Sequence, residues 1–209
     1  MMLIRFGRAL ALILLFLAAI TASAQVTGGL KVGGNAAFIL RSKTVVGTTE
    51  PKPGMVGGLF LSLPLSERVA VQPEVQYSQL GTTFKGSSRF SSSTRRKLYL
   101  DEVTVPLLLK VFLVRKKIHL HIGPQIGFIV RANQEGLNSG KATTFDVRSQ
   151  YRATDYGVVI GAGANLPLRL TFDVRYIAGL ADLTVAQIQE DIGVRNQHAL
   201  QLLLGLRIF

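Results

Sequence analysis

Apolar and polar residues alternate with a period of two in several separate segments of the chain. In the segment 169–179 the apolar positions are Leu170, Phe172, Val174 and Tyr176, and polar or charged residues occupy most positions between them. Successive side chains of a β-strand point to opposite faces, so this alternation predicts strands with one apolar and one polar face. Eight such strands are predicted, at about 28–40, 55–63, 69–80, 98–113, 118–131, 155–166, 169–179 and 197–208.

The connections between these segments alternate in length. Short connections lie at 64–68, 114–117 and 166–168, and long ones at 41–54, 81–97, 132–154 and 180–196. Strands of about ten residues with short turns on one rim and long loops on the other are typical of outer-membrane barrels. A soluble sandwich gives no reason for such regularity. The pattern predicts an all-β fold, namely a monomeric, eight-stranded, antiparallel up-and-down transmembrane β-barrel in a Gram-negative outer membrane, with both termini on the periplasmic side.

The first 24 residues have the pattern of a secretory signal peptide. Arg5 and Arg8 precede an apolar stretch at 9–20, and Ala22-Ser23-Ala24 forms an A-x-A cleavage site. A membrane-anchoring helix is the alternative, but the apolar stretch is short for a bilayer span. We therefore expect cleavage before Gln25, which leaves 25–209 as a single barrel domain.

Composition narrows the classes of protein and of chemistry. The chain has 209 residues, a formal net charge of +12 and no cysteine, which excludes disulfides, thiolate catalysis and Cys-ligated metals. No apolar run after the leader reaches helix-spanning length, although 48% of residues are hydrophobic, so a soluble β-protein or a membrane barrel remains. Glycines such as Gly161 and Gly163 fall inside predicted strands, where they would relieve crowding in a narrow barrel.

Charged residues on the polar parity of the strands are predicted to point into the barrel lumen. An eight-stranded barrel is just wide enough for side chains to fill it, and a buried charge without an opposite partner is costly. We therefore expect a plug of ion pairs and hydrogen bonds, and a narrow polar conduit is the alternative. The lumen ion-pair candidates are Lys31, Glu74, Glu102, Lys110, Asp173, Arg175 and Arg207.

Two histidines are candidates for a metal site or for a catalytic base. His119 and His121 are two residues apart, so both imidazoles lie on one strand face and a shared metal is conceivable. No further ligand lies nearby in sequence, and we expect histidines satisfied within the protein and no metal or other cofactor. The serines cluster at 87–93 without a histidine beside them, so no catalytic nucleophile with its base is predicted, and the protein is not expected to be an enzyme.

The predicted long loops are strongly basic. Their basic residues, with few acids among them, are Arg41, Lys43, Lys52, Lys85, Arg89, Arg95, Arg96, Lys97, Lys141, Arg148 and Arg152. Lipopolysaccharide is the anionic neighbour at that surface, and Arg95, Arg96 and Lys97 are its candidate ligands because arginine binds phosphate in a bidentate manner. Solvated loops without a ligand are the alternative, and nucleic acid is not an expected partner. The stretch 81–97 is predicted to be a mobile loop.

The segment Leu98-Tyr99-Leu100-Asp101-Glu102-Val103-Thr104-Val105-Pro106-Leu107-Leu108-Leu109-Lys110 resembles the fourth strand of the PorT-like outer-membrane β-barrel proteins of Bacteroidetes. The run His-Ile-Gly-Pro-Gln-Ile-Gly at 121–127 and the ending Gly-Leu-Arg-Ile-Phe are similar to that family too. This chain has two extra residues, Val103-Thr104, before the Val-Pro pair. The resemblance implies an OmpX-like barrel of eight strands, and its founding member is associated with protein secretion across the outer membrane.

The C-terminal strand is the predicted signal for the barrel-assembly machinery, through Leu204, Leu206, Ile208 and Phe209. Phe209 has the opposite parity to the other three, so we expect it to bend around the rim. Taken together, the sequence favours a structural or interaction role at the cell envelope, with a secretion-system or envelope protein as a further candidate partner. A narrow channel or a secretion accessory is the first alternative, and a lipid-modifying enzyme is the second.

Overall fold

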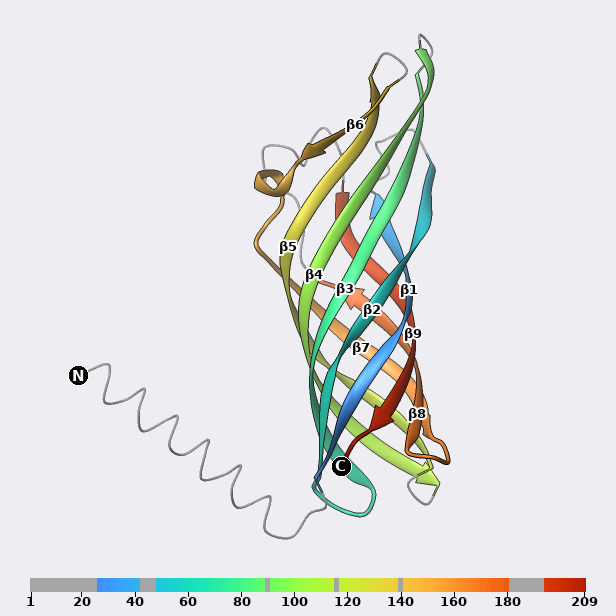
Figure 1. Ribbon diagram of the computed structural model, residues 1–209, viewed down its shortest axis with the longest axis vertical. Helices are drawn as coiled ribbons and strands as arrows, with labels where there is room; N and C mark the ends of the chain where they lie inside the picture. The colour runs from blue at the N-terminus through green and yellow to red at the C-terminus, as the bar shows by residue number, and fades with distance from the viewer. Residues whose placement is uncertain (1–25, 42–47, 89–90, 115–116, 139–140, 181–193) are drawn as a thin grey trace, which may run out of the picture.

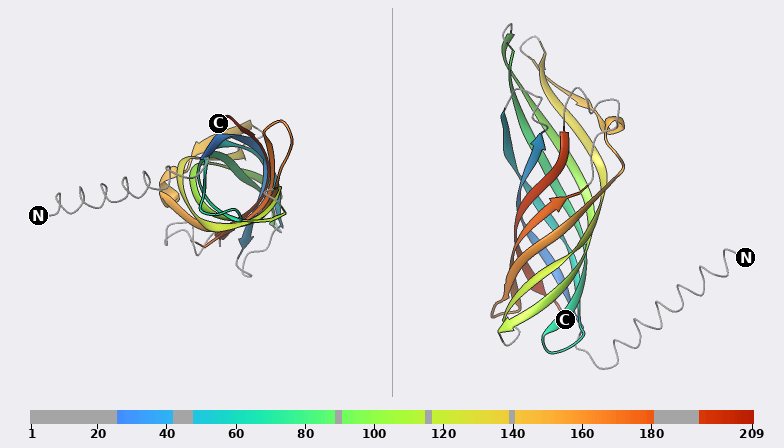
Figure 2. Two further views of the ribbon diagram at one scale, coloured as in Figure 1. Left: turned by 90° about the horizontal axis from the view of Figure 1, so that it is seen from below. Right: turned by 180° about the vertical axis from the view of Figure 1, so that it is seen from behind.

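The computed structural model describes residues 26–41, 48–88, 91–114, 117–138, 141–180 and 194–209. Eight antiparallel strands close into a barrel (Figures 1 and 2). They are β1 (Thr27–Arg41), β2 (Thr48–Pro64), β3 (Val69–Ser88), β4 (Ser91–Val114), β5 (Ile118–Asn138), β7 (Thr154–Asn165), β8 (Leu170–Gly179) and β9 (Val194–Arg207). Each strand pairs with its neighbours around the ring, and the β1–β9 and β4–β5 pairings leave no free edge within it. The predicted all-β, eight-stranded barrel is therefore confirmed.

The predicted lipid and lumen faces are reproduced along most of each strand. On β1, Leu30 and Val32 are 45% and 61% exposed, whereas Lys31 between them is 2% exposed. Outward residues on the other strands, such as Leu204 and Ile122, are likewise exposed apolar side chains. The reason is that an apolar exterior is tolerated only where hydrocarbon replaces water, while the polar parity can be satisfied inside a closed barrel.

The barrel has two different ends, which we call the turn end and the loop end. The turn end carries the β2–β3, β4–β5 and β7–β8 connections and both described ends of the chain, Val26 and Phe209 (Figure 1). Phe209 closes the ring there, since Gly28 and Phe209 exchange backbone hydrogen bonds. A side chain at 28 would meet the Phe209 ring, so the last residue packs over a glycine at this rim.

Strands at the loop end are longer than predicted. The stretch 81–97, predicted as a mobile loop, instead continues β3 and β4 as a paired hairpin, with Gly81 opposite Tyr99 and Lys85 opposite Arg95. Beyond the ring, β5 pairs with a ninth strand, β6 (Lys141–Asp146), which is followed by the short 3₁₀ helix η1 (Arg148–Gln150). Alternation of apolar residues stops in these parts, whereas the ladder of backbone hydrogen bonds continues without it.

One inward prediction is wrong for a structural reason. In the predicted strand 118–131, Arg131 has the same parity as His119 and His121 and would face the lumen, yet it is exposed, and the next residue, Ala132, is buried. The pairing partners of Asp101 and Glu102 are Arg131 and Ile129, so β5 has one extra residue at this point. Such a β-bulge reverses the facing of every residue beyond it.

Among the described residues, no helix is long and apolar enough to cross a membrane.

Candidate functional site: a charged cluster in the barrel lumen

Four of the predicted lumen charges meet in one place, and we call them the ion-pair cluster: Lys31, Glu74, Asp173 and Arg175. They come from β1, β3 and β8, and each is at most 2% exposed. The Lys31 ammonium lies 2.8 Å from Glu74 Oε1 and 2.7 Å from Asp173 Oδ2. The Arg175 guanidinium donates to both Glu74 oxygens at 2.7 Å. Two cations thus balance two anions.

Amides and a further lysine complete the hydrogen bonding of the cluster. Gln72 and Gln76 stand on either side of Glu74 on β3 and both donate to its carboxylate. Lys110 on β4 donates to the amide oxygen of Gln72 at 3.0 Å. Glu74 therefore accepts from four side chains, which is how a carboxylate remains charged in an enclosed space. This polar belt crosses the lumen between β1, β3, β4 and β8.

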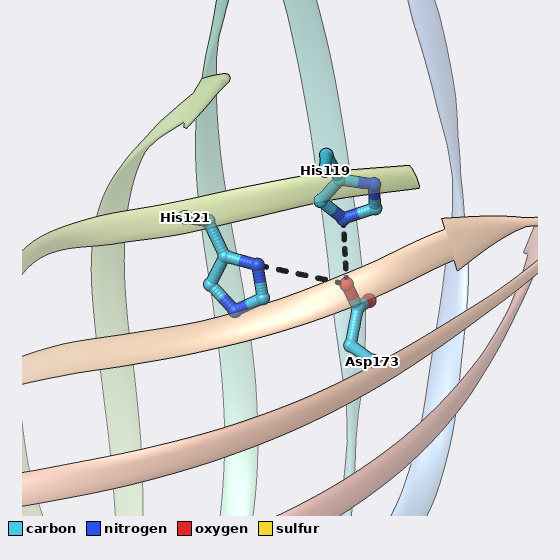
Figure 3. A group of neighbouring side chains, drawn as sticks. All are labelled: His119, His121 and Asp173. Atoms are coloured by element: carbon cyan, nitrogen blue, oxygen red, sulfur yellow. Dashed lines mark hydrogen bonds and ion pairs between the residues drawn. The ribbon is translucent and has the colours of Figure 1, made fainter. Parts of the chain in front are cut away.

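The two histidines of β5 reach the same cluster (Figure 3). His119 Nε2 lies 3.0 Å from Asp173 Oδ1, and His121 Nδ1 lies 3.9 Å from the same oxygen. The three side chains could offer ligand atoms within 4.8 Å of one another. However, Lys31 already lies on Asp173 and Arg175 is 3.7 Å from it. A divalent cation at this point would add charge to a carboxylate that is already neutralised, so the residues fit a hydrogen-bonded plug better than a metal site. His198, the third histidine, stacks on Tyr176 and takes no part.

Glycines on β7 make room for these side chains. A Cβ at Gly161 would lie 2.5 Å from His121 Nε2, and one at Gly163 would lie under 3.0 Å from Asp173 Oδ1 and His119 Nε2. Since real Cβ atoms essentially never come so close, only glycine fits at either position. The glycines predicted to relieve crowding thus form the part of the barrel wall against which the histidines and Asp173 pack.

Not every predicted lumen charge joins the cluster. Among the described residues, Lys110 is hydrogen-bonded to the cluster through Gln72 alone. Arg207 is half-buried at the turn end, and its Nε has no hydrogen-bond partner among the described residues. Glu102 lies on the loop side of the cluster, 1% exposed, and its Oε1 has no hydrogen-bond partner in the described part of the chain. These three residues have the inward parity that was predicted. Parity alone does not tell at which level along the barrel axis a side chain lies, so it could not show which charges would meet.

Glu102 borders a small cavity of about 10 Å³ on the loop side of the cluster. We call it the oxygen-lined chamber, and its polar walls include Glu102, Thr104, Gln125, Asp155, Gln197 and Gln201. Sequence reasoning did not single out Asp155, the first residue of the predicted strand 155–166, and it gave the three glutamines no role. Their parity could have placed them inside, but no sequence signal relates strands that are far apart in the chain.

The candidate lipopolysaccharide ligands were predicted in a long loop, but their backbone belongs to a strand. Arg95, Arg96 and Lys97 belong to β4 itself, opposite Lys85, Phe84 and Thr83 of β3. They are six to eight residues beyond Val103, roughly 20–26 Å along the strand at about 3.3 Å per residue. Their backbone therefore lies beyond the alternating apolar stretch of β4, and the positions of their side chains lie outside the described residues.

The segment after β6 is held down rather than free. Arg148 donates to the carbonyl oxygens of Ile129 at 2.9 Å and Tyr151 at 3.1 Å. Tyr151 is buried beside it, and this burial raises the pKa of the Tyr151 hydroxyl to about 12. Arg148, counted among the basic loop residues, thus serves the fold of this segment.

A family of outer-membrane protein β-barrel domains matches residues 18–185, most of the chain. The chain belongs to this family. The barrel thus lies in the outer membrane. No curated protein matches the chain significantly.

Several solved outer-membrane barrels are similar to the structure. Neisserial surface protein A is 14% identical, with 86% of this chain and 95% of that chain covered and a TM-score of 0.47. Ail of Yersinia pestis, solved with the heparin analogue sucrose octasulfate, is 12% identical, with 88% and 99% covered and a TM-score of 0.47. The N-terminal barrel of Pseudomonas aeruginosa OprF is 6% identical, with 88% and 100% covered and a TM-score of 0.45.

Proposed function

We propose that this protein is a non-conducting outer-membrane barrel with a structural or binding role at the cell envelope. The observation that carries the proposal is the ion-pair cluster. Glu74 is bonded to Lys31, Arg175 and two glutamines, and Asp173 is bonded to Lys31 and His119. Opening a path for ions would require this buried, charge-balanced network to be broken, which is costly.

Conductance in planar lipid bilayers tests the proposal. We expect no stepwise openings from the wild-type barrel over the voltage range in which the bilayer itself is stable. The double variant Glu74→Ala/Arg175→Ala removes one anion and one cation together, so it keeps the balance of charge while emptying the plug. It is expected to conduct, and it serves as the positive control. Stepwise openings of the wild type would overturn the proposal in favour of the narrow-channel alternative.

We infer that binding takes place on the extension at the loop end, formed by β3, β4, β5 and β6 beyond the ring (Figure 1). Lipopolysaccharide is the proposed anionic ligand, with Arg95, Arg96 and Lys97 of β4 as its candidate contacts, and the protein acts as a monomer. The test is binding of lipopolysaccharide micelles to the wild type and to Arg95→Gln/Arg96→Gln/Lys97→Gln. Arg68→Gln/Lys117→Gln, at the turn end, is the matched control. Equal binding by all three proteins would contradict this role for β4.

An accessory role in protein secretion is the second candidate function. The resemblance of 98–110 to the fourth strand of PorT-like proteins favours it, and a secretion-system or envelope protein would then be the partner. Deletion of the gene should reduce the amount of secreted protein in the culture medium, and a plasmid copy should restore it. An unchanged set of secreted proteins after deletion would remove this candidate.

The remaining expectations are proposals with direct tests. We propose that the barrel is not an enzyme, so the lipid A profile should be the same with and without it.

We also propose that the leader is removed after Ala24, which N-terminal sequencing of the membrane form checks. The barrel-assembly machinery would recognise the last strand through Leu204, Leu206, Ile208 and Phe209. Phe209→Ala should then lower the amount of barrel in the outer membrane more than it lowers stability in detergent.

A further inference from the structure

The oxygen-lined chamber differs from the ion-pair cluster in the sign of its charges. Glu102 and Asp155 are 1% and 8% exposed, and neither forms an ion pair within the described residues. The chamber thus places two like charges together and encloses them, an arrangement that is unfavourable unless a cation or a proton joins them.

Glu102 and Asp155 both lie against one glycine of the barrel wall, Gly127. Glu102 reaches inward from β4 and Asp155 from β7, on either side of β5. A Cβ built at Gly127 of β5 would be 3.2 Å from Glu102 Oε2 and 3.5 Å from Asp155 Cβ. Both acids therefore approach the same point on the wall, and the absence of a side chain at 127 leaves that point open.

The chamber also holds oxygen atoms that nothing in the described structure satisfies. Glu102 Oε1, Thr104 Oγ1, Gln197 Oε1 and Gln201 Oε1 are all buried without a hydrogen-bond partner. They come from strands β4 and β9, and all four residues border the same cavity. A buried polar atom without a partner costs free energy, so unsatisfied acceptors gathered around one space point to a missing donor or cation.

Carboxylate, amide and hydroxyl oxygens without nitrogen or sulfur are the ligand set that hard cations prefer. Two carboxylates would balance a divalent charge, and neutral amides and a hydroxyl would add coordination without excess charge. Calcium accepts six to eight oxygen ligands in an adaptable geometry, and a cavity of about 10 Å³ has room for a single ion. We propose that the oxygen-lined chamber binds a divalent cation of the calcium type between Glu102 and Asp155.

Calcium titration of the purified membrane form of the barrel in detergent, after removal of divalent ions with EDTA, tests this proposal. Calorimetry should show one saturable site, and the unfolding temperature read from the β-sheet circular dichroism should rise with calcium. Glu102→Gln and Asp155→Asn should each weaken binding at least tenfold and remove most of the rise. Glu67→Gln, in the exposed β2–β3 turn, is the matched control and should bind as the wild type does.

The variants remain informative because they are nearly isosteric and remove a repulsion. In EDTA both should unfold at the wild-type temperature or above it, so that loss of the calcium effect cannot be ascribed to misfolding. Absence of saturable binding by the wild type would overturn the proposal and leave a proton shared by the two carboxyls. Binding that survives both substitutions would overturn it too, since the calcium would then lie elsewhere, for example on bound lipid phosphates.

Discussion

The two halves of the lumen are built from the same alternation and reach opposite electrostatic outcomes. Toward the turn end, Lys31, Glu74, Asp173 and Arg175 form a closed set of ion pairs. Toward the loop end, Glu102 and Asp155 lie together without a cation among the described residues, and amide oxygens around them are unsatisfied. The comparison teaches that inward parity places a side chain in the lumen. Its position along the barrel axis then decides whether it meets an opposite charge and is paired, or stays unpaired and available to a ligand.

Removing an anion from the closed half should have the largest effect. Glu74→Ala would leave Lys31 and Arg175 buried with one anion fewer, and the expected loss is about 3–5 kcal/mol of unfolding free energy. Denaturant unfolding of the barrel in detergent measures it. Glu67→Ala, at an exposed turn, is the control and should be nearly neutral. A Glu74→Ala barrel as stable as the control would mean that the cluster does not stabilise the fold.

Filling the space under the cluster should have the next largest effect. Gly163→Ala forces a methyl group against Asp173 and His119, and the expected cost of such overpacking is about 1–3 kcal/mol. Gly57→Ala is the matched control, because its nearest neighbours would be 3.7 Å and 3.9 Å away, an ordinary contact distance. The same unfolding experiment compares them. Equal stability of the two variants would show that the histidines can move aside freely.

The open half should respond in the opposite direction. Glu102→Gln, measured in EDTA, is expected to raise the unfolding free energy by about 1 kcal/mol, because it removes an uncompensated buried charge. The corresponding substitution in the closed half, Glu74→Gln, should lower the unfolding free energy, because it removes the anion that Lys31 and Arg175 are paired with. Unfolding both variants side by side checks the sign, and a loss of stability in Glu102→Gln without calcium would contradict the distinction between the halves.

The smallest effect is expected at the edge of the cluster. Neither ring nitrogen of His121 has a hydrogen-bond partner within the described residues, so His121→Leu should change stability by less than about 1 kcal/mol. His119→Leu is its counterpart and should cost about 1.5–3 kcal/mol, since it removes a hydrogen bond to the charged Asp173. If the order of these two losses were reversed, the role given to His119 in the plug would be wrong.

Local pattern was sufficient for the barrel but not for its outer parts. Strands such as β8 and β9 are correctly predicted because each side chain there points either to lipid or to the lumen. Apolar residues occupy the first kind of position and polar residues the second, so the alternation is visible in the sequence. The hairpin at 81–97 and strand β6 escaped prediction because apolar and polar residues do not alternate there, whereas the backbone ladder continues without that pattern. Arg131 was misplaced since a bulge of one residue leaves no mark in the hydrophobic pattern.

The sequence by itself determined the class of the protein, its membrane and the parity of nearly every lumen residue, because burial in lipid or lumen acts on each residue separately. Only the tertiary structure decided which inward residues meet. Glu74 and Arg175 are 101 positions apart in the chain, and their contact depends on strand register and on barrel closure. The same closure separates Glu102 from every lumen cation of the cluster and brings Asp155 to it, which no spacing along the chain records.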